Sequence, residues 1–223
     1  MQFIHSEGPE PGIAALNKRL SSELSSGKQV LWLVCGGSNI VAEAEIMKRI
    51  PADLTERLTV TLTDERYGDI GHKDSNWQQL LEAGFDIKSG RAFPVLTGAS
   101  LEQTVTSYGK LVKALLEKAD ITIATFGIGA DGHIAGILPE TPAARETAAL
   151  TAGYDSPPYT RLTMTFPALK QIDVAYAMAF GDSKREALQR LEKENITLAE
   201  QPSQILKQLP EAYLYSDQIG GNS

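Results

Sequence analysis

The sequence predicts an α/β protein with a layered, Rossmann-like, mostly parallel sheet and helices on both faces. Two observations lead to this prediction. Short apolar runs, typical of strands buried on both faces, alternate along the chain with segments of helical periodicity. The 223 residues also contain no internal repeat, low-complexity segment or long Pro/Gly-rich linker. We therefore expect a single domain over residues 1–223.

The elements follow one another in regular alternation. Ile13, Leu16, Leu20 and Leu24 are spaced by three and four residues, which predicts the apolar face of a helix that ends near residues 25–27. The apolar run 30–35 predicts a buried strand. The other elements expected in this half are a helix from about 39 to 49, a β-branched strand at 58–62, a helix at 75–83 and a short strand at 92–95.

The second half repeats the pattern. Ser100 stands three residues before Gln103, a capping-box spacing that predicts the start of a helix reaching about residue 118. The run 121–126 predicts a strand, and its pattern is second only to that of 30–35 in clarity. The elements expected beyond it are strands at 162–165, 174–180 and 212–215 and a helix at 183–194.

Composition and charge exclude several functional classes. With 42% hydrophobic and 22% charged residues, the chain is typical of globular proteins rather than of disordered or fibrous ones. A net charge of −7 without a dense Lys/Arg run argues against nucleic acid or an anionic membrane as a partner. The longest apolar run is far shorter than the ~20 residues that span a bilayer, and the N-terminus does not resemble a signal peptide. We expect a cytoplasmic protein.

Four polar clusters stand at the carboxyl ends of predicted strands, which is where open parallel sheets bind ligands. Each cluster alone is a weak signal, but their common placement predicts one shared site. The clusters are Gly36-Gly37-Ser38, Asp64-Glu65-Arg66, the run 127–133 (GIGADGH), and Gly181-Asp182-Ser183-Lys184.

The first cluster suits a phosphate group. Gly36, Gly37 and Ser38 lead from a strand into a helix, so their backbone N–H groups and the helix dipole could hold an anion. The alternative is an ordinary tight turn in which Ser38 caps the helix. The sequence matches neither the Walker loop nor the G-x-G-x-x-G pattern.

Two cations from different strand ends could complete that phosphate site. Arg66 can hold two phosphate oxygens in a fork, whereas Lys184 acts as a point charge. Arg161 is a third candidate. The alternatives are an ion pair of Arg66 with Asp64 or Glu65, and a solvated position for Lys184.

His133 is the candidate general base, because it follows three glycines and an aspartate directly after a buried strand. Asp131 or Asp64 would orient its ring. The alternative is a histidine that only caps a helix start. We expect no metal site, because no second ligand stands at metal-binding spacing from His133. His5 is expected to lie at a frayed terminus. Cys35 is interpreted as a core residue rather than a nucleophile.

Taken together, these motifs resemble the 6-phosphogluconolactonase family over about residues 30–190. The resemblance rests on five motifs in the family's order, which are far more specific together than singly. They are Gly36-Gly37-Ser38, Asp64-Glu65-Arg66 with Asp74-Ser75-Asn76, the run 127–133, the run 157–165 (PPYTRLTMT) and Gly181-Asp182-Ser183-Lys184.

The resemblance implies a sugar-phosphate isomerase/CoA-transferase-like fold and hydrolysis of 6-phosphoglucono-δ-lactone in the oxidative pentose phosphate pathway. By the same resemblance, His133 activates water and the Gly37-Ser38 loop, Arg66 and Lys184 hold the phosphate. Such a reaction needs a water, a base and oxyanion donors, and no cofactor is expected. The partner is then a small anionic sugar-phosphate lactone.

The chain also departs from the family, which usually has Ser, Thr and Pro where Cys35, Asn39 and Ile40 stand, and often Ser at Gly136. One alternative is a glucosamine-6-phosphate deaminase-like isomerase. That group has a carboxylate just before the proline that follows the histidine motif, whereas Glu140 falls one place beyond Pro139. A second alternative is a non-catalytic sugar-phosphate sensor, although we find neither room nor basic charge for a DNA-binding helix-turn-helix.

Overall fold

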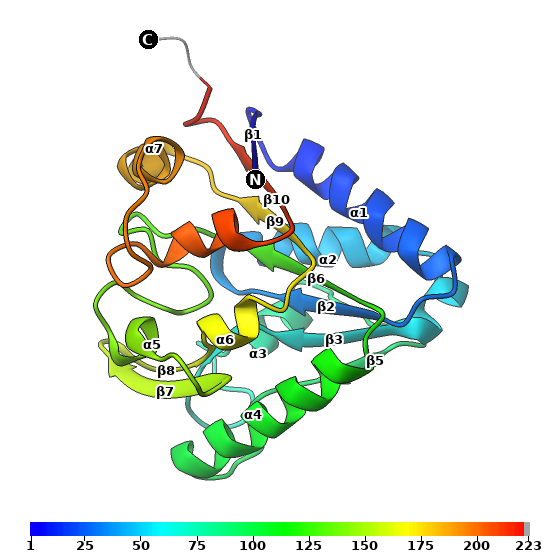
Figure 1. Ribbon diagram of the computed structural model, residues 1–223. Helices are drawn as coiled ribbons and strands as arrows, with labels where there is room; N and C mark the ends of the chain where they lie inside the picture. Colours follow the sequence, from blue (N-terminus) through cyan, green and yellow to red (C-terminus); the bar gives the residue numbers. More distant parts are fainter. Residues whose placement is uncertain (221–223) are drawn as a thin grey trace.

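The computed structural model describes residues 1–220 and is built on a seven-stranded parallel sheet (Figure 1). Its strands are β1 (Gln2–His5), β2 (Val30–Val34), β3 (Leu58–Leu62), β5 (Arg91–Phe93), β6 (Ile121–Phe126), β9 (Val174–Met178) and β10 (Glu211–Ser216). Their order is β1-β10-β9-β6-β2-β3-β5. Every residue of β2, β6 and β9 is buried, as expected for strands covered on both faces. The predicted α/β fold is confirmed.

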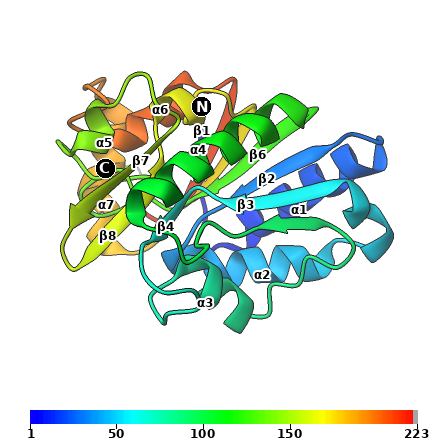
Figure 2. The same cartoon turned by 90° about the horizontal axis from the view of Figure 1, so that it is seen from below.

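Helices cover both faces of this sheet. Figures 1 and 2 show α1 (Glu10–Ser25) and α2 (Ile40–Arg49) on one face and α4 (Leu101–Lys118) and α6 (Phe166–Leu169) on the other. The capping box predicted at the start of α4 is present. The remaining helices are α3 (Asn76–Glu82), α5 (Pro142–Arg145) and α7 (Arg185–Lys193), with 3₁₀ turns η1 (Gly37–Asn39), η2 (Ala52–Arg57), η3 (Asp182–Lys184) and η4 (Pro202–Gln208).

A second, antiparallel sheet lies beyond the end of β3. It contains β4 (Asp64–Arg66), β8 (Tyr159–Met164) and β7 (Thr151–Ser156), in that order. The strand predicted at 162–165 therefore belongs to this sheet. Thr63 connects the two sheets, because its N–H donates to Val34 O (2.8 Å) and its carbonyl accepts from the N–H of Met164 (2.8 Å).

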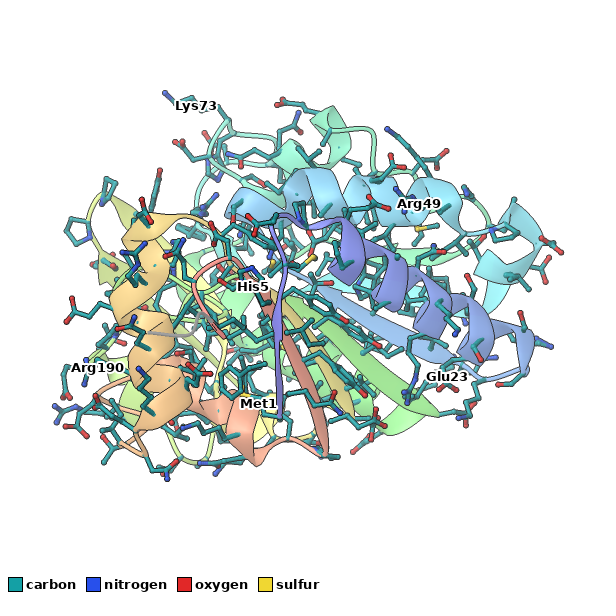
Figure 3. The ribbon with its side chains drawn as sticks, turned by 90° about the horizontal axis from the view of Figure 1, so that it is seen from above. Met1, His5, Glu23, Arg49, Lys73 and Arg190 are labelled. Carbon is teal, nitrogen blue, oxygen red and sulfur yellow. The ribbon has the colours of Figure 1, made fainter. Side chains whose placement is uncertain are left out.

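The N-terminus is ordered, so the expectation of a frayed end at His5 was wrong. β1 pairs in parallel with β10, and the Nδ1 atom of His5 lies 3.0 Å from the carbonyl oxygen of Ile219. Figure 3 shows His5 at the end of this edge strand, and it shows α1 and α2 side by side.

Among residues 1–220, none of the helices has both the length and the apolar character needed to cross a membrane.

Candidate active site

The four polar clusters meet around a cavity of about 570 Å³ at the carboxyl ends of the parallel strands. Every cluster contributes to its wall, as their shared position in the sheet predicts. Arg161 of β8 and Asn76 of α3 line the same cavity. The residues from the clusters are Gly36, Gly37, Ser38, Asp64, Arg66, Gly127, Ile128, Gly129, His133 and Lys184.

His133 and Asp131 form the titratable pair of this site. The Nδ1 atom of His133 lies 2.6 Å from Oδ1 of Asp131, and the same oxygen accepts the backbone N–H of His133 at 3.1 Å. With Nδ1 donating to the carboxylate, Nε2 is left as the basic nitrogen. The side chain of His133 is 36% exposed and lines the cavity, so water can reach it.

The loop around this pair explains its glycines. A Cβ atom on Gly129 would lie 2.0 Å from Nδ1 of His133 and 2.6 Å from Oδ1 of Asp131, so a side chain there would displace both. The loop closes through the N–H of Gly129, which donates to His133 O at 3.0 Å. His133 stands in this loop rather than at a helix start, so the helix-capping alternative is wrong.

Asp131 is held in its ionised form. Burial alone would raise the pKa of this carboxyl, but the hydrogen bond and the charge of His133 outweigh burial and lower the pKa to about 2. A carboxylate that is ionised at neutral pH fixes the imidazole tautomer and stabilises the imidazolium once a proton is taken up. The structure therefore pairs the ring of His133 with Asp131.

Asp64 lies elsewhere in the cavity wall. Its Oδ1 accepts from the hydroxyl of Thr63 (3.0 Å), and its backbone carbonyl accepts from Nδ2 of Asn76 (2.9 Å). A Cβ atom on Gly36 would fall 1.9 Å from Oδ1 of Asn76, so only glycine fits beside this amide. A glycine at position 36 is thus needed for the packing of Asn76 against the loop.

Glu65, predicted from the sequence only as a possible ion-pair partner of Arg66, instead holds the backbone of Arg66 and the start of α3 together. Its carboxyl accepts the N–H groups of Arg66 (2.7 Å), Asn76 (2.6 Å) and Trp77 (3.1 Å) and the hydroxyl of Ser75 (2.9 Å). Burial raises the pKa of Glu65, and these four donors oppose that rise. The signal in the sequence was the Asp74-Ser75-Asn76 motif, whose cap-like Ser75 precedes α3.

Arg66 of β4 and Arg161 of β8 bring positive charge to the cavity lining. Both guanidinium groups lie over the ring of Tyr159, with distances from Cζ to the ring centroid of 5.3 and 5.6 Å. Arg66 donates from Nη1 to Asp74 O at 2.9 Å, and within residues 1–220 it forms no ion pair. The expected alternative of an ion pair with Asp64 or Glu65 is therefore wrong.

The glycine loop and the cationic side chain of Lys184 also line the cavity. Gly37 and Ser38 are exposed to the cavity, and Lys184 reaches it from η3 after β9. Ser38 does not cap α2, because the residue at the cap position is Asn39 and its side chain makes no capping bond. The loop N–H groups and the Ser38 hydroxyl are thus available to an anion.

Cys35 lies beneath the glycine loop, where it is buried as expected of a core residue. Burial, with the nearby carboxyls of Glu43 and Asp64, raises the pKa of its thiol well above the ordinary value. A thiol that stays protonated is a poor nucleophile. Within the described residues, no group of three or more His, Cys, Asp and Glu side chains is arranged to hold a metal ion.

Comparison with known proteins gives a consistent assignment. The family model described as glucosamine-6-phosphate isomerases/6-phosphogluconolactonase matches residues 12–214. A 6-phosphogluconolactonase of Pseudomonas aeruginosa is 30% identical over 188 residues, covering 79% of this chain and 78% of the relative.

Solved structures share the fold at lower identity. A 6-phosphogluconolactonase of Thermotoga maritima superposes with a TM-score of 0.82 at 18% identity, covering 96% of this chain and 97% of the other. A monomeric glucosamine-6-phosphate deaminase gives 0.74 at 21% identity, covering 98% of both chains. At such identities the likeness shows the fold alone.

Proposed function

The chain belongs to the family of glucosamine-6-phosphate isomerases and 6-phosphogluconolactonases, and on that premise we propose that it hydrolyses 6-phospho-D-glucono-1,5-lactone to 6-phosphogluconate. The observation that carries the proposal is His133, whose Nδ1 lies 2.6 Å from Oδ1 of Asp131, in the lining of the same cavity as three cationic side chains. The pair supplies a base for water, and the cations suit a phosphate.

The proposed reaction begins with His133. Its Nε2 takes a proton from a water molecule as the water oxygen attacks the lactone carbonyl carbon, and Asp131 stabilises the imidazolium. The tetrahedral intermediate then collapses with cleavage of the bond between that carbon and the ring oxygen. The imidazolium returns its proton to the ring oxygen, which leaves an open-chain hydroxy acid.

The phosphate is assigned to the Gly37-Ser38 loop, Arg66, Arg161 and Lys184. Arg66 and Arg161 each have a buried Nε that lacks a hydrogen-bond partner within residues 1–220, and both residues line the cavity. Binding of a group remote from the reacting carbon can position the lactone against His133. In this proposal Asp64 accepts a hydroxyl of the sugar, because its carboxylate lines the cavity without contacting His133.

The arrangement of Glu140 favours the lactonase over a deaminase. Glu140 is exposed, pairs with Arg145 and stands outside the cavity lining, so the motif histidine lacks this carboxylate as a neighbour.

The test is turnover of freshly generated 6-phosphogluconolactone, followed by acid release and corrected for spontaneous hydrolysis. We expect saturable, enzyme-dependent hydrolysis without an added cofactor. Hydrolysis no faster than the spontaneous rate would overturn the proposal.

A further inference from the structure

Asn39 stands at the N-cap position of α2, but its side chain does not cap that helix. Asparagine at this position ordinarily accepts a hydrogen bond from a backbone N–H of the first turn. Here the side chain makes no such bond and points into the protein, where the residue is 3% exposed. The amide is therefore used elsewhere.

The amide of Asn39 joins the ends of three adjacent strands. Its Nδ2 donates to the carbonyl of Phe126 at 2.8 Å and to that of Met178 at 3.3 Å, and it lies 3.8 Å from Sγ of Cys35. Phe126 and Met178 are the last residues of β6 and β9, and Cys35 directly follows β2. These strands are neighbours in the order β9-β6-β2.

Each of the three strand ends begins a different wall of the cavity. The chain after β2 forms the glycine loop, the chain after β6 carries His133, and the chain after β9 carries Lys184. One buried side chain thus contacts all three segments at the points where they leave the sheet. Movement of any segment relative to the others would break a bond to the same amide.

A second residue on the same face of α2 strengthens this connection. Glu43 follows Asn39 by one helical turn, is fully buried, and accepts the N–H of Cys35 through Oε1 at 2.7 Å. Cys35 is therefore held through its backbone by Glu43 and contacted at its sulfur by Asn39. The start of the glycine loop is fixed by α2 on both counts.

We propose that Asn39 is a positioning residue that fixes the glycine loop and Lys184 relative to His133. By holding the phosphate-binding groups in place, Asn39 ensures that a bound lactone presents its carbonyl carbon to His133. This inference rests on the proposed function. Catalytic groups need placement within about 0.5 Å, and a displacement of about 1 Å can cost ~100-fold in rate. Asn39 is among the residues that line the cavity, but its amide is bonded to the carbonyls of Phe126 and Met178 and in this proposal contacts neither the phosphate nor the reacting carbon.

The test compares two lactones in Asn39→Leu and Asn39→Ala. Leucine has a similar size without the donor, and alanine avoids any steric conflict. The matched control is Asn17→Leu, because Nδ2 of Asn17 on α1 also donates to a backbone carbonyl, that of Ile46 at 3.2 Å, outside the cavity lining. The substrates are 6-phosphogluconolactone and unphosphorylated gluconolactone.

In both Asn39 variants we expect kcat for the phosphorylated lactone to fall about 10- to 100-fold. Hydrolysis of gluconolactone and the inhibition constant of inorganic phosphate should each change less than about threefold. Asn17→Leu should keep the wild-type preference for the phosphorylated substrate. This pattern separates correct placement from phosphate affinity and from general stability.

Three results would overturn the inference. The first is an unchanged preference in folded variants, and the second is an equal loss for both lactones. The third is failure of both variants to fold, which would make Asn39 a residue of folding rather than of placement. Wild-type protein that does not prefer the phosphorylated lactone would instead overturn the proposed function, before any variant is assayed.

Discussion

Arg66 and Arg161 lie directly opposite each other on the antiparallel strands β4 and β8, with the ring of Tyr159 beneath both guanidinium groups. Like charges in cross-strand register repel each other and destabilise a sheet. The aromatic face offsets part of this repulsion through cation–π attraction. Both arginines line the cavity, where in the proposed function a phosphate would neutralise their charge.

The first prediction therefore concerns the cations. Arg66→Ala and Lys184→Ala should each lower kcat/KM for 6-phosphogluconolactone about 10- to 150-fold, since a charged hydrogen bond is worth roughly 1.5–3 kcal/mol. Unphosphorylated gluconolactone, assayed at high concentration, should be hydrolysed at nearly the wild-type rate. If both lactones suffer equally, these residues shape the fold or stabilise the oxyanion instead, and the phosphate assignment is wrong.

The second prediction concerns the Asp131–His133 pair. His133→Ala should lower kcat about 10²- to 10⁴-fold, because the water loses its base. Asp131→Asn should also lower kcat, because the imidazolium loses its neighbouring negative charge. The pKa of Asp131 is near 2, so titration of this carboxyl should not appear in rate profiles above about pH 4.

The control for this pair is His5→Ala, since His5 lies on the edge strand β1 outside the cavity lining. Circular dichroism should show that all three variants are folded. A folded His133→Ala variant with near-normal turnover would exclude His133 as the base.

The third prediction separates the two activities named in the family. The protein should release no ammonia from glucosamine 6-phosphate, because Glu140 pairs with Arg145 outside the cavity lining. Ammonia would be measured in the preparation that hydrolyses the lactone. Ammonia release at a rate comparable to lactone hydrolysis would reverse the assignment.

The fourth prediction concerns stability and pH at Glu43. Burial raises the pKa of this carboxyl well above its ordinary value. In the unfolded chain Glu43 ionises near its ordinary pKa, whereas in the folded protein it keeps its proton up to a higher pH. At pH values between these two pKa values, unfolding therefore releases a proton. The free energy of unfolding should therefore fall as pH rises through this window, by at most about 1.4 kcal/mol per pH unit from this group.

Glu43→Gln is the matched variant, because its amide oxygen can still accept the N–H of Cys35. Urea unfolding from pH 5 to pH 8 should show a flatter pH dependence in Glu43→Gln than in the wild type. Parallel curves for the two proteins would show that Glu43 does not hold a proton in the folded state.

The sequence by itself determined the parallel sheet, most of its helices and the identity of the cavity loops. Those features depend on local patterns. Short uninterrupted apolar runs such as 30–35 are typical of strands covered on both faces, and the capping box at Ser100 begins a helix wherever that helix packs. The loops were predictable because parallel strands bring their carboxyl ends to one edge.

Only the tertiary structure decided the antiparallel sheet and the pairing of charged groups. β4 has only three residues and β7 is partly polar, and both become strands because β8 supplies their hydrogen bonds. The partner of His133 was undecided between Asp131 and Asp64, because both follow buried strands and only the turn closed at Gly129 brings Asp131 to the ring. The amide of Asn39 has the same dependence, since its acceptors lie 87 and 139 residues away along the chain. Local sequence cannot encode contacts whose partners are assembled only when the sheet forms.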